Sequence, residues 1–111
     1  MNLEKIRTVI PDFEMENFQI FDTITSLSFE TEKDELTGKD YKNVSLVLEN
    51  KENQVELKCL HTRLLRFQET KSIKNFYVSQ LEHQGYELGE QGNEELKLYC
   101  DDIVIQRCEK L

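Results

Sequence analysis

Cys59 and His61 are the residues whose types and spacing come nearest to catalytic chemistry. They lie two positions apart in a stretch that alternates apolar and polar residues, so their side chains are expected on one face of a strand. A nearby imidazole can act as the base that activates a thiol nucleophile. No neighbouring residues mark an oxyanion site, however, and Cys59 and Cys100 each extend an apolar alternating face. We therefore expect both cysteines to be small core residues, and we expect the chain not to be an enzyme.

Metal and cofactor motifs are absent from the sequence. The three cysteines form no Cys-x-x-Cys pair, and the histidines, His61 and His83, are not spaced as paired ligands. The adjacent acidic pairs Asp34-Glu35, Glu94-Glu95 and Asp101-Asp102 would point to opposite faces if they lay in strands. We interpret these pairs as solvated turns, and we expect no catalytic residue, no bound metal and no cofactor.

Charge is distributed unevenly along the chain, whose net charge is −8. Residues 1–40 hold ten acidic and four basic residues, and residues 81–111 hold eight and three, whereas residues 41–80 hold four and seven. The acidic ends argue against nucleic acid or an anionic membrane as partner, and they favour a basic partner or simply solubility. The basic residues between them are expected to pair with the acidic ends across strands, with anion binding as the alternative. They are Lys58, His61, Arg63, Arg66, Lys71 and Lys74.

The length of 111 residues predicts one domain, residues 1–111, with a single core and no disulfide or metal. No stretch approaches the roughly 18 apolar residues of a membrane-spanning helix. The first residues, MNLEKIRTVIPDFE, lack the basic start and apolar run of a signal peptide. Together with the odd number of cysteines, this leads us to expect a cytoplasmic protein with reduced thiols.

The clearest structural signal is a β-hairpin over Tyr41–Leu60. Apolar residues alternate with other residues over 44–48 and again over 55–59, and the polar run ENKENQ at 49–54 joins the two arms. Leu46 and Leu57 lie mid-strand on the apolar faces, so we expect both to be buried. A two-stranded hairpin is marginal in water, so the rest of the chain must cover its apolar face.

The other elements follow from weaker patterns. We expect a short helix from Asn2 through Val9, a strand over most of 18–31 and a polar loop over 30–40. Further strands are expected over 61–68, 95–100 and 103–108, while 72–85 fits a helix and a strand equally well. A strand to about Val78, followed by a short helical turn, is the compromise that we adopt. The predicted fold is mainly β: an antiparallel β-sandwich or partly open barrel of six to eight strands with one or two short helices.

Residues 73–105 resemble small bacterial immunity proteins, the antitoxins carried beside polymorphic or contact-dependent growth-inhibition toxins. The resemblance lies in a series of sheet-packing motifs rather than in chemical ones. These motifs are Phe76-Tyr77-Val78, Gly85-Tyr86-Glu87, the acidic turn Asn93-Glu94-Glu95, the strand Leu96–Cys100 and the last strand Ile103-Val104-Ile105. Tyr86 stands where the family pattern leads us to expect Trp.

The resemblance implies a non-enzymatic protein that neutralises a cognate toxin domain through a stoichiometric complex. Many such toxins are nucleases with basic clefts, which agrees with the acidic ends of this chain. We expect a protein that is a monomer or weak homodimer when free and that binds neither nucleic acid nor membrane. The residues expected to meet the toxin are Glu30, Glu32, Asp34, Glu35, Asp101 and Asp102.

A small-ligand-binding β-barrel is the alternative function. The sequence holds several phenylalanines in and near the expected strands, and these could line a cavity instead of filling the core. They are Phe18, Phe21, Phe29, Phe67 and Phe76. We favour the core interpretation, because small protein cores are densely packed.

Overall fold

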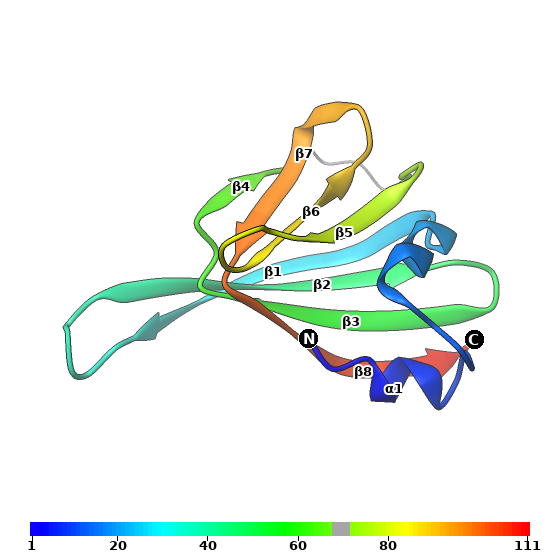
Figure 1. Cartoon of the computed structure of the whole chain (residues 1–111), viewed down its shortest axis with the longest axis horizontal. Coiled ribbons are helices and arrows are strands. Elements are labelled where there is room, and N and C mark those ends of the chain that lie inside the picture. The colour runs from blue at the N-terminus through cyan, green and yellow to red at the C-terminus, as the bar shows by residue number, and fades with distance from the viewer. Residues whose placement is uncertain (68–71) are drawn as a thin grey trace.

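Two antiparallel four-stranded sheets form the protein (Figure 1). The computed structural model describes residues 1–67 and 72–111. Sheet A has the strand order β1-β2-β3-β8 and sheet B the order β4-β7-β6-β5. The sheets share one hydrophobic core and do not close into a barrel. The predicted fold, an antiparallel β structure of six to eight strands with one or two short helices, is confirmed.

Sheet A is built on the predicted hairpin. Its strands are β1 (Thr23–Lys33), β2 (Asp40–Glu49), β3 (Asn53–Leu60) and β8 (Asp102–Lys110). Leu46 of β2 lies opposite Leu57 of β3, and both side chains are fully buried, as the alternation predicted. The inner face of β2 and β3 therefore forms the sheet A side of the core.

Sheet B consists of β4 (Leu64–Arg66), β5 (Phe76–Gln80), β6 (Tyr86–Glu90) and β7 (Asn93–Cys100). The helical turn predicted after Val78 is wrong, because β5 continues to Gln80 and a turn leads directly into β6. Gly85 closes this turn with a φ of 92°, and its carbonyl accepts a hydrogen bond from the amide of Leu81 at 2.9 Å. The strand predicted over 61–68 is only β4, and Gln68 lies outside the described residues.

The N-terminal segment departs most from the sequence expectation. The helix predicted over 2–9 is a single turn, α1 (Glu4–Arg7), and the strand predicted from Phe18 begins only at Thr23. A 3-10 helix, η1 (Met15–Ile20), precedes that strand. The aromatic rings of this segment explain the difference: Phe13, Phe18 and Phe21 pack on one another and are fully buried.

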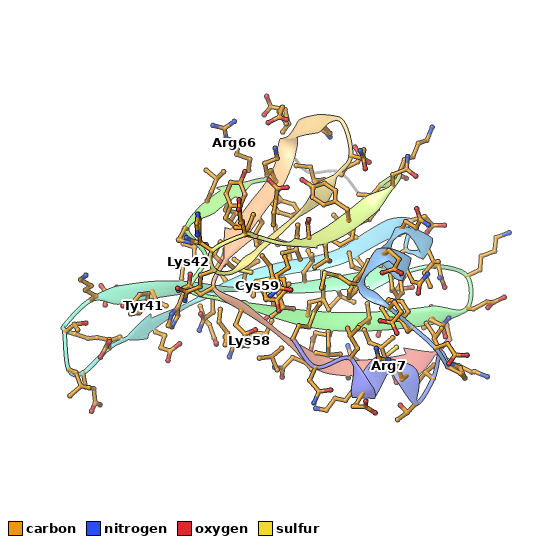
Figure 2. The ribbon with its side chains drawn as sticks, in the orientation of Figure 1. Arg7, Tyr41, Lys42, Lys58, Cys59 and Arg66 are labelled. Atoms are coloured by element: carbon orange, nitrogen blue, oxygen red, sulfur yellow. The ribbon has the colours of Figure 1, made fainter. Side chains whose placement is uncertain are left out.

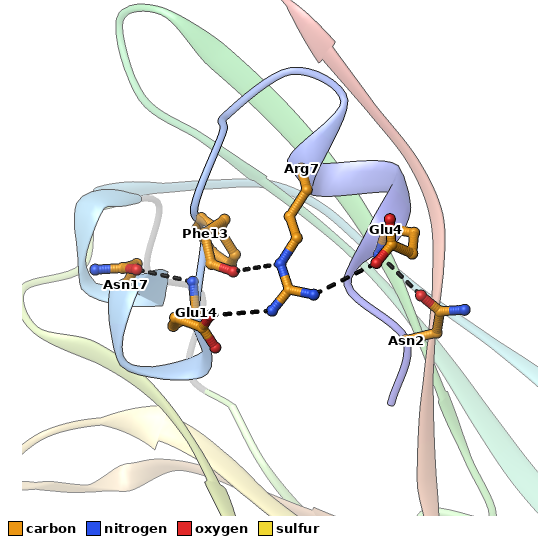
Figure 3. A network of polar contacts seen from close by, with 6 residues as sticks. All are labelled: Asn2, Glu4, Arg7, Phe13, Glu14 and Asn17. Atoms are coloured by element: carbon orange, nitrogen blue, oxygen red, sulfur yellow. Dashed lines mark hydrogen bonds and ion pairs between the residues drawn. The ribbon is translucent and has the colours of Figure 1, made fainter.

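Arg7 fastens this segment together (Figure 3). Its Nε donates to the carbonyl of Phe13 at 2.9 Å, while its terminal nitrogens lie 3.2 Å from a Glu14 oxygen and 3.5 Å from a Glu4 oxygen. One guanidinium thus joins α1 to the start of η1. This contact keeps the segment folded against the core, where Ile6 and Phe13 are buried.

The strands β1 and β2 continue well beyond the rest of sheet A (Figure 1). Pairing of β2 with β3 ends at Val44 and Cys59, whereas pairing of β1 with β2 extends to Lys33 and Asp40. Residues 29–43, which we call the arm, therefore form a two-stranded ribbon that projects from the molecule. The predicted polar loop over 30–40 is wrong at its start, because β1 runs to Lys33 and only 34–39 form the turn.

Candidate protein-binding surface

A compact turn closes the tip of the arm. An Asp34 side-chain oxygen accepts a hydrogen bond from the amide of Leu36 at 2.9 Å, and the Asp34 carbonyl accepts one from the amide of Gly38 at 2.7 Å. Gly38 has a φ of 72°, a left-handed conformation that glycine adopts without steric cost. The turn leaves Leu36 with 97 % of its surface exposed. The tip is thus an ordered turn that presents an apolar side chain to solvent.

The base of the arm lies against a corner where two connections between the sheets run side by side. The amide of Asp101 donates to the carbonyl of Leu60 at 2.9 Å, and the amide of Arg63 donates to the carbonyl of Tyr99 at 2.8 Å. These bonds join the β3–β4 connection to the β7–β8 connection. Five side chains gather at this place, and we call them the corner cluster: Glu32, Tyr41, Asn43, His61 and Asp101.

Asn43 is the buried member of the corner cluster, with 2 % of its surface exposed. Its side-chain amide donates to a Glu32 carboxylate oxygen at 2.9 Å, and its side-chain oxygen accepts from the backbone amide of His61 at 3.0 Å. Both polar ends of the side chain are therefore satisfied, which a buried amide requires. Asn43 links the arm to the β3–β4 connection.

His61 connects the two acidic segments that the sequence placed far apart. Its imidazole stacks on the Tyr41 ring with a centroid separation of 4.0 Å. Its Nε2 lies 3.8 Å from a Glu32 oxygen, and its Nδ1 lies 3.5 Å from an Asp101 oxygen. Arg63 adds a cation to this place, with its Nε 3.3 Å from the other Asp101 oxygen. Glu32 and Asp101, both predicted to be contact residues, are thus brought to one place.

Glu30 is held by a lysine from the neighbouring part of sheet A. Lys58 Nζ lies 2.6 Å from a Glu30 oxygen. The hydrogen bond and the charge of Lys58 lower the pKa of Glu30, and the same hydrogen bond raises the pKa of Lys58. The predicted pairing of basic residues with the acidic ends is confirmed for Lys58, His61 and Arg63, while Lys71 lies outside the described residues.

The remaining predicted contact residues do not share the corner. Asp34 and Glu35 lie in the turn at the tip. Asp102 points away from Asp101: one of its oxygens accepts from the amide of Ile103 at 2.8 Å and lies 3.8 Å from the amino group of Met1. The predicted set is therefore split between the base of the arm, its tip and the N-terminal end of β8.

The predicted Cys59–His61 arrangement is wrong in its geometry. Cys59 is fully buried in β3, whereas His61 has a φ of 54° beyond the end of that strand and turns toward Tyr41. Contact with the Cys100 thiol, followed by burial, raises the pKa of Cys59. Cys59 and Cys100 both lie in the core, as expected, and Figure 2 shows Cys59 between the sheets.

A second polar cluster lies on the outer face of sheet B. Cross-strand pairing places Tyr99 beside Glu87, and Lys97 Nζ lies 3.8 Å from a Glu87 oxygen. A hydrogen bond with Glu87 raises the pKa of Tyr99, and burial together with Glu87 raises the pKa of Tyr77 to about 12. These side chains are engaged with one another, so this cluster is a self-contained network.

Residues that could hold a metal do not converge in residues 1–67 and 72–111, where no group of three His, Cys, Asp or Glu side chains has ligand geometry.

The predicted core role is confirmed for Phe18, Phe21 and Phe76, which are buried. Phe67 is partly buried against the core, whereas Phe29 is 54 % exposed on the arm beneath the Lys42 ammonium, which lies 5.5 Å from its ring centre.

Sequence reasoning missed Leu36, Tyr41, Lys42 and Asn43. Leu36 carried a usable signal, because it is the one apolar residue in the polar run ETEKDELTGKD. Tyr41 and Asn43 carried none, because only the tertiary structure brings His61 next to them.

Comparison of the chain with protein-family models, with curated proteins and with solved structures finds no significant match. Within the described residues, no helix has the length and apolar character needed to cross a membrane.

Proposed function

We propose that the protein is an immunity protein that neutralises a cognate toxin domain, a nuclease with a basic cleft, by forming a stoichiometric complex. The observation that carries this proposal is the arm. It projects beyond the core and ends in Leu36, which is 97 % exposed and contributes nothing to the packing of its own chain. Together with the exposed Phe29 on the same arm, Leu36 is available for burial against a partner.

The arm has the chemistry of an interface that recognises a protein. Leu36 and Phe29 are exposed on it and Tyr41 is half-buried at its base, and aromatic side chains are enriched at interfaces. The corner cluster fixes the base of the arm on the rigid part of the molecule. Preorganisation of this kind lowers the entropy that is lost on binding.

The charges of the arm fit a basic partner. Residues 29–43 contain five acidic and three basic residues, and Glu35 is exposed at the tip. An inhibitor that competes with nucleic acid for a basic cleft gains association rate from acidic groups at its rim. Glu30 and Asp101 already contact Lys58 and Arg63, whereas Glu35 is exposed at the tip, so Glu35 is the better candidate for steering.

The test uses the toxin domain encoded beside the gene for this protein. Co-expression should yield a one-to-one complex and should abolish the activity of the toxin. Leu36→Ala should weaken the complex, while Val104→Ala, which removes an exposed apolar side chain from β8, should not. If the adjacent gene product is not bound by the full-length protein, the proposed function is wrong.

The alternative, a small-ligand-binding β-barrel, has less support from the described residues. A ligand cavity would need free space among the phenylalanines. Phe13 and Phe18 instead meet edge to face with a centroid separation of 5.0 Å, and Phe21 completes the cluster. A thermal-shift screen that finds a stabilising small molecule would revive this alternative.

A further inference from the structure

The outer edge of the arm offers main-chain hydrogen-bonding groups to solvent. β1 is an edge strand of sheet A, and its partner on the other side is β2. At the start of β1, far from the arm, this edge is occupied. Thr23 bridges to Ser72, and the carbonyl of Asp22 accepts a hydrogen bond from the amide of Ile73. From Ser28 to Lys33 every residue is exposed.

The direction of each β1 amide follows from bonds made by β2. The carbonyl of Lys42 accepts from the amide of Thr62 at 2.7 Å, so the main-chain groups of Lys42 point toward β3 and away from β1. The carbonyl of Val47 accepts from the Thr25 hydroxyl, so odd-numbered residues of β2 point toward β1. Because directions alternate along a strand, Tyr41 and Asn43 are the β2 residues on the arm that bond to β1.

This alternation identifies which main-chain N–H and C=O groups of β1 are free to bind a partner. Glu30 lies opposite Asn43, and Glu32 lies opposite Tyr41, so the main-chain groups of these two glutamates are used within the arm. The N–H and C=O groups of the alternate residues, Phe29, Thr31 and Lys33, point outward. Within the described part of the chain, no hydrogen bond engages these outward groups.

We propose that the arm binds its partner by strand addition, with Phe29, Thr31 and Lys33 pairing to an edge strand of the toxin domain. An exposed, extended edge is a template for such pairing, and main-chain bonds supply affinity that does not depend on side-chain identity. This inference rests on the proposed function and specifies how the partner is held.

Charge selects the occupant of this edge. Two copies of β1 related by a two-fold axis at Thr31 would place Glu30 of each copy opposite Glu32 of the other, and like charges directly opposite are destabilising. Glu30 and Glu32 remain 57 % and 56 % exposed despite their contacts with Lys58 and His61. An added strand with lysine or arginine at alternate positions would meet both carboxylates. The edge thus favours a basic strand over a second copy of this chain.

The test removes one outward amide and leaves the rest of the arm in place. Thr31→Pro deletes a donor that makes no bond to any other described residue, and proline is tolerated on edge strands. Thr31→Ala is the matched control, because it also loses the hydroxyl but keeps the N–H. Binding of the neighbouring toxin domain to the full-length protein should weaken about tenfold or more in Thr31→Pro, and by less than about threefold in Thr31→Ala. Lys33→Pro repeats the test at the next outward amide.

Amide hydrogen exchange supplies a readout that does not depend on a variant. The amides of Phe29, Thr31 and Lys33 should exchange rapidly in the free protein and become protected in the complex. If a complex forms but these amides stay unprotected and Thr31→Pro binds normally, strand addition is wrong while the immunity function stands. If the full-length protein binds no toxin, both proposals fail. Protection at high concentration of the free protein alone would identify a second copy as the occupant and overturn the basic strand.

Discussion

At the scale of single residues, Asn43 and His61 decide how the arm is attached. An Asn in the middle of a strand is disfavoured by its side chain, yet Asn43 is buried because both of its polar ends are satisfied. His61 adopts a left-handed backbone that places its ring on Tyr41. The local cost of both residues is offset by the connection that they make between the arm and the corner.

Asn43→Ala should lower the free energy of unfolding by about 1–3 kcal/mol, because it leaves the amide of His61 without its acceptor in a desolvated place. Urea unfolding measures the change. Gln106→Ala, at an exposed position of β8, should change stability by no more than about 0.5 kcal/mol. Equal effects at both positions would show that the buried amide contributes nothing to the attachment of the arm.

Tyr77 should lose its phenolic proton at a higher pH than an ordinary tyrosine. Burial, with a further contribution from Glu87, raises its pKa from 10.0 to about 12. Because the phenolate is disfavoured only in the folded chain, the stability that Tyr77 contributes is complete below pH 10 and declines as the pH rises toward 12. An ultraviolet difference titration of the wild-type protein against Tyr77→Phe should show this midpoint. In urea, where the chain is unfolded, the titration midpoint of Tyr77 should return to the ordinary value for tyrosine. A midpoint that does not move on unfolding would contradict the assignment.

At the scale of elements, the hairpin of β2 and β3 has one face in the core, and the arm has neither face there. Leu46 and Leu57 lie opposite each other and are fully buried. The first residues of β2, before its pairing with β3 begins at Val44, belong to the arm. There β1 and β2 form two strands whose side chains are mostly exposed. One strand thus serves as core in one half and as display surface in the other.

Leu46→Ala and Leu57→Ala should each destabilise the protein by about 2–5 kcal/mol, through lost transfer energy and the cavity left behind. Because the two side chains are in contact across the strands, the double variant should deviate from the sum of the single effects. Chemical denaturation of the wild type, the two single variants and the double variant measures this coupling in a double-mutant cycle. A cost below about 1 kcal/mol at both positions would contradict the packing of this face.

At the scale of the whole molecule, the two sheets provide a rigid body and the arm provides reach. The principal extents of 42 × 29 × 27 Å reflect the projection of the arm from a body of otherwise similar dimensions. Part of the basic middle contacts the acidic ends near the base of the arm, where Lys58 contacts Glu30, and His61 and Arg63 contact Asp101. The sheets therefore provide stability, whereas the arm presents residues to solvent.

Shortening the arm should leave the fold intact. Replacing 33–40 by Asn-Gly puts a two-residue turn between Glu32 and Tyr41, which already lie opposite each other. Because the deleted residues are exposed except for the half-buried Asp34, the free energy of unfolding should change by less than about 1 kcal/mol. Binding of the toxin domain should be lost. A stable shortened protein that still binds would remove the arm from the interface.

Steering by charge should appear in the association rate. Asp34 builds the turn at the tip, so Glu35→Lys is the cleaner charge reversal. It should slow association with a basic toxin more than it speeds dissociation, and added salt should diminish the effect as the Debye length falls from about 10 Å to about 3 Å. Glu95→Lys changes the same charge at an exposed site on β7 and is the control. Stopped-flow rates indifferent to salt and to Glu35→Lys would refute electrostatic capture by the tip.

The sequence by itself determined the features that depend on alternation and composition. Burial of Leu46, Leu57, Cys59 and Cys100 followed from their positions on apolar faces, because a strand alternates its side chains with a period of two. The predominance of antiparallel strands followed from the regular spacing of polar turns. The pairing of Lys58 and Arg63 with acidic residues from the two ends also followed, because opposite charges are stable neighbours.

Only the tertiary structure decided what alternation leaves open. Phe18 and Phe21 fit a strand by pattern, but burial with Phe13 placed Phe18 in η1, and the strand begins only at Thr23, after Phe21. Glu30 and Glu32 read as loop residues, yet pairing with β2 extended the strand beneath them. The corner cluster joins residues 69 positions apart, from Glu32 to Asp101, through contacts that no local pattern encodes. Such contacts depend on how the two sheets pack, and that is a property of the whole core.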